Sequence, residues 1–216
     1  MSTGSFRTAI ACAISLLASA AVPAVAAPIT TTVQGIGDAN FGPRAGSTVI
    51  DFNSGLPSDP NFSGSGSLYG LHTGSQSGVA ATPFGDATQY YSTGVGTTTV
   101  TFDETATYLG LLWGSVDGYN SIEFYDGNTL VGTIGGSDIR NPANGDQGIG
   151  GTFYVNFDVA GGFNRIKLRS SGYSFEIDDL AYGAHYDRIA EVPEPTSVLL
   201  LGAGLFALGC ARRRRA

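Results

Sequence analysis

Three acidic residues, Glu176, Asp178 and Asp179, are the side chains best suited to holding a ligand. In the segment 173–182 (YSFEIDDLAY), strand-like alternation turns the apolar residues inward and leaves Glu176 and Asp178 together on the outer face. Asp179 breaks this alternation and is therefore the freest of the three. Clustered carboxylates supply the oxygen ligands that Ca²⁺ prefers. With Asp51 in the segment VIDFN, these residues form a candidate calcium site.

A second interpretation of the same carboxylates needs no metal. The preceding segment 164–170 (NRIKLRS) places Arg165, Lys167 and Arg169 on one face of a predicted strand, and the residues SSGY that follow can close a hairpin. In such a hairpin the three cations would pair across the strands with the carboxylates. The sequence leaves both interpretations open, with ion pairing favoured.

Aromatic side chains raise the question of sugar binding, because a flat ring offers apolar area with a polar edge. Tyr119 and Tyr125 lie beside two Asp-Gly turns, so they are the tyrosines that we expect to be exposed. Trp113, in the apolar segment LGLLWGS, is predicted to be core. The loop 138–151 offers Asn, Asp and Gln side chains for hydrogen bonds, although it also fits a plain surface connection.

Catalytic patterns are weak. His72 and His185 are the two histidines of the chain, and the segment 74–78 (GSQSG) lacks the G-x-S-x-G spacing of a nucleophile turn. A glycosidase needs two carboxylates, but nothing in the sequence singles out a pair. We therefore predict that the protein is not an enzyme. A polysaccharide-active hydrolase is the least favoured alternative.

The middle of the chain has the pattern of a β protein. It is rich in glycine and carries short alternating runs, such as 152–159, and an Asp-Gly pair at 126–127 that indicates a hairpin. We expect an all-β fold, an antiparallel β-sandwich that is jelly-roll-like. Residues 54–96 are predicted to be long loops with one or two irregular strands. The expected strands are 47–53, 97–103, 107–113, 121–125, 129–134, 152–159, 164–170 and 173–182.

Charge and cysteine usage exclude several partners. All 18 acidic residues lie between Asp38 and Glu194, whereas five of the 11 basic residues lie in the two terminal segments. Without those segments, six basic residues face 18 acids, a net charge of −12. Such a surface repels nucleic acid, so no nucleic-acid partner is expected. Both cysteines, Cys12 and Cys210, also lie in the terminal segments, and the body therefore offers no thiol for catalysis or metal binding.

The N-terminal segment has the features of an export signal. Residues 1–26 contain one positive residue, Arg7, then a small and apolar stretch that ends in Ala24-Val25-Ala26. This pattern predicts a signal peptide that signal peptidase removes. The rest of the chain would then lie outside the cytoplasmic membrane.

The C-terminal segment is apolar and ends in positive charge. The residues 196–211 carry no charge, and a helix of this length would extend roughly 24 Å, which is short for a bilayer core of about 30 Å. The arginines that follow would stay in the cytoplasm. We expect a single hydrophobic helix that enters the membrane but is a poor permanent anchor.

This end of the chain carries Val192-Pro193-Glu194-Pro195, then the apolar segment, then the four arginines. The order of these features resembles the PEP-CTERM sorting signal of exosortase-dependent proteins of Gram-negative bacteria. The resemblance implies recognition by an exosortase, processing near the Pro-Glu-Pro motif, and delivery to the cell surface or extracellular matrix. It assigns no role to Cys210. The domain organisation becomes 1–26 signal peptide, 27–183 ectodomain, 184–195 tether and 196–216 sorting helix. The residues that carry the resemblance are Val192, Pro193, Glu194, Pro195, Arg212, Arg213, Arg214 and Arg215.

The region 100–183 is also similar to a group of exosortase-dependent surface proteins of cyanobacteria and proteobacteria, which implies a shared β-rich ectodomain without a defined activity. We therefore expect a structural or adhesive protein in an exopolysaccharide or biofilm matrix. The alternative is a lectin-like carbohydrate-binding module, with a structural calcium ion as an option and no other cofactor. The predicted partners are exosortase and signal peptidase during export, extracellular polysaccharide, and the membrane before processing.

Overall fold

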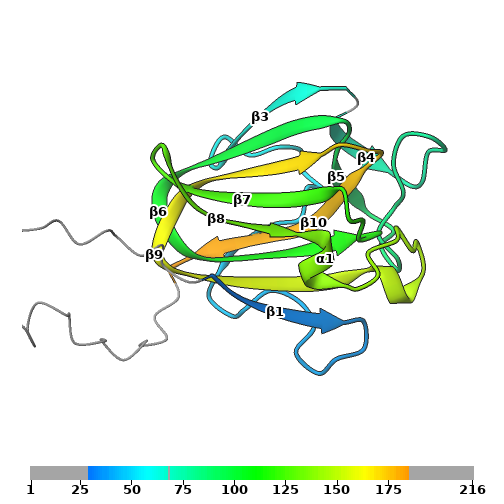
Figure 1. Cartoon of the computed structure of the whole chain (residues 1–216), viewed down its shortest axis with the longest axis horizontal. Helices are drawn as coiled ribbons and strands as arrows, with labels where there is room; N and C mark the ends of the chain where they lie inside the picture. The colour runs from blue at the N-terminus through cyan, green and yellow to red at the C-terminus, as the bar shows by residue number, and fades with distance from the viewer. Residues whose placement is uncertain (1–28, 68, 185–216) are drawn as a thin grey trace, which may run out of the picture.

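Antiparallel strands make up most of the folded part of the protein. The computed structural model describes residues 29–67 and 69–184, and Figure 1 shows them as one body built of long strands. Within these ranges no helix is both long and apolar enough to cross a membrane. The predicted signal peptide, sorting helix and most of the tether lie outside the described residues.

Ten strands and two short helical turns follow one another along the chain. The strands are β1 (Ile29–Gly35), β2 (Thr48–Ile50), β3 (Asn61–Gly66), β4 (Gly70–Thr73), β5 (Gln89–Thr93), β6 (Gly96–Gly114), β7 (Asn120–Asp126), β8 (Thr129–Gly135), β9 (Phe153–Ser170) and β10 (Phe175–Gly183). The helical turns are α1 (Gly136–Ile139) and η1 (Ile149–Gly151), both in the loop between β8 and β9.

All ten strands belong to one sheet, in which the path β4-β5-β10-β6-β9-β7-β8 is extended by β1 on β9, β2 on β10 and β3 on β6. The two long strands β6 and β9 connect its two parts. Residues 96–101 of β6 pair with 165–170 of β9 beside β3 and β7, whereas residues 108–113 pair with 153–158 beside β1 and β10. The register of this pairing shifts between 101 and 108.

The change of register in β9 lies at a pair of glycines. Gly161 and Gly162 have φ angles of 91° and 84°, a left-handed backbone that glycine adopts without steric cost. A Cβ atom at Gly162 would stand 2.5 Å from the side chain of Thr105 on β6. Position 162 therefore requires glycine for both conformation and space, and position 161 for conformation.

The apolar core lies where inward side chains of the two parts of the sheet meet. Phe124 of β7 packs against Phe157 of β9 with ring centroids 5.4 Å apart, and Phe62 of β3 packs against Tyr91 of β5 at the same separation. Trp113 is fully buried and stacks on Phe175 at 4.4 Å, as its apolar neighbours predicted. Aromatic pairs of this kind contribute about 0.5–1.5 kcal/mol beyond the burial of their area.

The predicted all-β antiparallel fold is confirmed, and so is the hairpin at 126–127, where Asp126 pairs with Thr129. The division into two separate sheets is not confirmed, because β6 and β9 run through both parts. Four strands were not expected as such: β1, and β3, β4 and β5 within the segment predicted to be mainly loops.

The predicted hairpin between 164–170 and 173–182 is wrong. β10 pairs with β2, β5 and β6 and is not a neighbour of β9 in the sheet. The cations of β9 therefore do not face the carboxylates of β10. Arg169 instead forms an ion pair with Glu123 of β7, at 2.6 Å.

Candidate functional site

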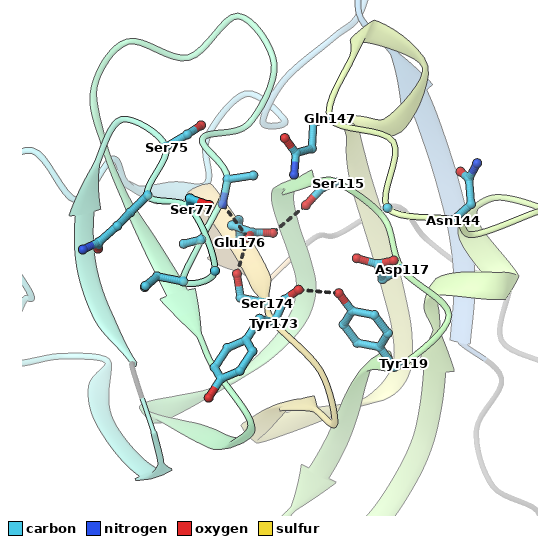
Figure 2. A pocket seen from close by; sticks show the side chains of 16 residues that line it. Ser75, Ser77, Ser115, Asp117, Tyr119, Asn144, Gln147, Tyr173, Ser174 and Glu176 are labelled. Atoms are coloured by element: carbon cyan, nitrogen blue, oxygen red, sulfur yellow. Dashed lines mark hydrogen bonds between the residues drawn. The ribbon is translucent and has the colours of Figure 1, made fainter.

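A polar cavity of about 560 Å³ opens at the end of the sheet where β10 begins and β6 ends. Three loops and one strand end surround it: the loop after β4, the loop after β6, the β8–β9 loop and the start of β10. Its wall is mostly hydroxyl, amide and carboxylate groups. The side chains labelled in Figure 2 are Ser75, Ser77, Ser115, Asp117, Tyr119, Asn144, Gln147, Tyr173, Ser174 and Glu176.

Glu176 lies at the centre of this cavity wall and connects three of its segments. Its Oε1 atom accepts the N–H of Ala81 at 2.9 Å and the hydroxyl of Ser174. Its Oε2 atom accepts the hydroxyl of Ser115 at 2.7 Å (Figure 2). Burial raises the pKa of Glu176, and the three hydrogen bonds oppose that rise. Glu176 therefore anchors the loop after β4 to the strand ends of β6 and β10.

Strand alternation explains why this carboxylate faces the cavity. Phe175 and Ile177 point into the apolar core, as predicted, so Glu176 and Asp178 point to the opposite side of β10. That side is not open to solvent, however. The segment 74–88 covers it, and Glu176 is 1% exposed and Asp178 4% exposed.

The aromatic edge of the cavity is held by the two tyrosines at its rim. Tyr119 donates its hydroxyl to the carbonyl of Tyr173 at 2.6 Å, and both rings are partly exposed (Figure 2). Tyr119 also lies against the backbone of Gly172, where a Cβ atom would approach its ring to 2.9 Å. Tyr119 was predicted to be exposed and to contact a ligand. It is 37% exposed and lies at this rim; ligand contact stays a prediction.

Asp117 supplies the second carboxylate of the cavity. Burial raises its pKa, and the nearby hydroxyl of Tyr119 opposes that shift. The β8–β9 loop packs closely against it: Asp117 forms a β-bridge with Asn144, and a Cβ atom at Gly145 would lie 2.5 Å from the carboxylate. Gly145 has a φ angle of 67°, so glycine is favoured here for its backbone as well.

The structure divides the four residues of the predicted calcium site. Asp51, Asp178 and Asp179 line a separate cavity of about 570 Å³ with Asp86, whereas Glu176 lines the cavity described above. Among the described residues, no three His, Cys, Asp or Glu side chains converge as a metal site requires. Burial, together with Asp86 and Asp179, raises the pKa of Asp178 to about 8. A structural calcium ion stays a prediction, and the four residues do not form one site for it.

The remaining candidate residues lie elsewhere. Tyr125 is on the outer face of β7, where its hydroxyl donates to Glu123 at 2.6 Å, far along the strand from the cavity. His72 stacks on Tyr90 in the β4–β5 pair with ring centroids 5.9 Å apart and is not part of the cavity wall. His185 lies outside the described residues.

Sequence reasoning missed most of the cavity wall. The segment 74–78 lacks the spacing of a nucleophile turn, and the loop 138–151 offers amide side chains; both contribute to the wall. Ser115, Asp117 and Ser174 had no signal beyond their positions next to strand ends. Their convergence depends on which strands become neighbours, and local pattern does not determine that.

Comparison with known proteins adds one finding, at the C-terminus. No curated protein and no solved structure matches the chain. A family model, however, matches residues 191–215, and its description is a PEP-CTERM protein-sorting motif. Such a motif implies export, processing by exosortase and sorting to the surface or membrane. The chain thus carries a PEP-CTERM sorting signal at its C-terminal end, as its residue pattern predicted.

Proposed function

We propose that this chain is an exported, exosortase-processed protein of the surface or extracellular matrix of a Gram-negative bacterium, with a structural or adhesive role among exopolysaccharides. The observation that carries the proposal is the sorting motif at residues 191–215. The motif directs delivery and specifies no ligand. The role of the delivered domain is therefore argued from its own surface.

We further propose that the domain binds and does not catalyse. Both oxygen atoms of Glu176 are occupied by donors of the protein itself, so this carboxylate is poorly placed to transfer a proton to a substrate. The serines of the cavity have no histidine beside them in the described wall, and serine nucleophiles need such a base. The folded sheet, with aromatic contacts between its two parts, supports treating the domain as a β-sandwich scaffold of the jelly-roll kind.

A lectin-like function is the second candidate, and the polar cavity favours it. Hydroxyl and amide groups from four segments can exchange hydrogen bonds with sugar hydroxyls, and the ring of Tyr119 offers a stacking surface at the rim. A cavity of about 560 Å³ lies in the usual size range of small-ligand sites. A neutral oligosaccharide fits this chemistry best, because the wall carries two carboxylates and no cation.

The delivery proposal is tested by comparing the native host with a strain of it from which the exosortase has been deleted. With the enzyme, we expect surface or matrix fractions to contain a form that lacks Arg212–Arg215, measured by mass spectrometry of the C-terminal peptide. Without it, we expect the uncut chain to stay with the membrane fraction. An uncut chain in the matrix fraction of the wild-type host would contradict the proposal.

The lectin-like alternative is tested on a glycan array with the purified full-length chain. We expect Tyr119→Ala to reduce binding of a neutral glycan by roughly tenfold, which is about 1.4 kcal/mol, because the sugar loses the apolar ring face on which it stacks. Tyr69→Ala is the matched control, because Tyr69 is an exposed tyrosine outside the cavity wall. Equal losses in both variants, or no glycan bound by the wild type, would reject this alternative without affecting the delivery proposal.

A further inference from the structure

Most of the positive charge of the described chain lies on one face of the sheet. Arg165, Lys167 and Arg169 are three of the five lysine and arginine residues in the ranges 29–67 and 69–184. They alternate along β9 with the buried Ile166 and Leu168, so all three point outward. Successive outward residues of a strand are roughly 6.6 Å apart, which spreads the three cations over about 13 Å.

The strand pairing surrounds these cations with hydroxyl groups. On one side they face Thr101, Thr99 and Thr97 of β6, which in turn face outward residues of β3 that include Ser63 and Ser65. We call Arg165, Lys167, Arg169 and the three threonines the cationic face. Figure 1 shows β3, β6, β9 and β7 running side by side across it.

The positive charge of this face is only partly neutralised. Across the three paired rows, Glu123 of β7 is the one carboxylate, and it is already bound to Arg169 and to the hydroxyl of Tyr125. Asp103 and Asp126 lie beyond the last row along their strands. The face therefore carries a net charge of about +2 on a chain whose net charge is −7.

The two remaining cations are positioned by Tyr125. The guanidinium carbon of Arg165 lies 5.0 Å from the centre of its ring and the Nζ atom of Lys167 lies 4.8 Å from it. Among the described residues neither cation forms an ion pair with a carboxylate. Arg165 donates to the carbonyl of Gly127, whereas the ammonium group of Lys167 keeps its donors for an incoming anion.

We propose that the cationic face binds an acidic polysaccharide, a polymer that carries carboxylate groups among neutral hydroxyls. The cations recognise the carboxylates, and the threonine and serine hydroxyls of β6 and β3 bond to the sugar hydroxyls beside them. A flat sheet surface suits an extended polymer better than a small molecule, which needs a concave site. This inference rests on the proposed matrix function and adds a second binding surface to it. The cationic face would bind anionic polymers, and its binding does not depend on the polar cavity.

Two other polyanions are outcomes of the test. Nucleic acid is disfavoured because the backbone of single-stranded DNA presents phosphates without the neutral sugar hydroxyls that the threonine and serine groups would bind. A second copy of the chain could place an acidic surface against the cationic face. The experiment distinguishes both from the polysaccharide.

The experiment measures retention of the purified full-length chain on immobilised polygalacturonate and on immobilised dextran, as salt is raised from about 0.05 M to about 0.5 M. We expect binding to polygalacturonate that weakens steeply with salt, and little binding to dextran on this face. Lys167→Gln should weaken binding by roughly two- to fivefold, the range of one exposed ion pair. Lys167→Arg should keep it.

Arg140→Gln is the matched control, because it removes the same charge from the β8–β9 loop, where Arg140 pairs with Asp146. Equal weakening by Lys167→Gln and Arg140→Gln would show that net charge matters and the cationic face does not. Binding to dextran that equals binding to polygalacturonate would overturn the proposal. So would tighter binding to single-stranded DNA, or a loss of self-association in sedimentation when Lys167 is changed and no polymer is bound.

Discussion

Removing the carboxylate of Glu176 is the most informative perturbation of this fold. The residue is 1% exposed and receives hydrogen bonds from Ala81, Ser115 and Ser174, which belong to three different segments. Glu176→Ala leaves all three donors without this acceptor. Glu176→Gln keeps the shape of the side chain and one oxygen acceptor.

The magnitude follows from the three bonds. A buried N–H left without a partner costs about 1–3 kcal/mol, and each lost hydroxyl hydrogen bond costs about 0.5–1.5 kcal/mol. Water from the adjacent cavity can solvate part of the exposed wall, so we expect Glu176→Ala to lower the free energy of unfolding by about 2–4 kcal/mol. For a protein of this size that is a fall in Tm of roughly 5–12 °C. Glu176→Gln should stay within about 1–2 kcal/mol of the wild type.

The pH dependence has a defined sign. Because burial raises the pKa of Glu176 above its ordinary value of 4.5, the folded state binds more protons than the unfolded state above that pH. The contribution of this residue to stability is therefore present below pH 4.5 and declines as pH rises through the folded pKa. Glu176→Gln removes this titration, so its stability relative to the wild type should improve as pH rises.

Urea unfolding followed by tryptophan fluorescence measures these changes, since Trp113 is the one tryptophan and is buried in the core. Asp117→Asn is the control, because it changes the other carboxylate of the same cavity and should cost less than about 1 kcal/mol. Stability of Glu176→Ala within about 0.5 kcal/mol of the wild type would refute the role of Glu176 as the anchor of the three segments.

Three further predictions concern single residues. Burial raises the pKa of Asp178 from 3.8 to about 8, so wild-type stability should fall as pH rises from about 4 to about 8. Asp178→Asn should flatten this pH dependence in thermal melts at a series of pH values. Trp113→Ala should lower the free energy of unfolding by about 3–5 kcal/mol in circular-dichroism melts, because it removes a fully buried ring stacked on Phe175; a loss below about 1 kcal/mol would contradict its core position. Gly162→Ala should cost about 1–3 kcal/mol by urea unfolding, since its φ angle is 84° and the added Cβ meets Thr105, whereas Gly127→Ala, with open space around it, should cost less.

Local pattern predicted the strands whose alternation is strict. The segments 121–125 and 129–134 lie within β7 and β8, and 152–159 begins one residue before β9, with Ile122, Phe124, Val155 and Phe157 buried as expected. It predicted one or two irregular strands in 54–96, where three form: β3 is mostly glycine and serine, and β4 and β5 are too short to show a clear alternation. Those strands form because neighbouring strands offer partners, which the sequence does not display.

The candidate sites show the same limit. Glu176, Asp178, Asp179 and Asp51 were grouped by residue type, and alternation did place the first two on one side of β10. A loop from far back in the sequence then covered that side and separated Glu176 from the others. The error about the cations of β9 came from assuming that consecutive strands pair, whereas β6 lies between β9 and β10.

The sequence alone revealed the sorting signal, because such a signal is a short linear pattern that can be recognised without the tertiary structure. It also predicted the β class, because apolar and polar residues alternate in several of the strands. Only the tertiary structure decided which charges meet, because strand order in a sheet follows from the packing of the whole core. Partners across this sheet can be far apart in the chain, as Thr48 of β2 and Tyr182 of β10 are. The anchored carboxylate of Glu176 and the ion pair of Arg169 with Glu123 both arise from that long-range order.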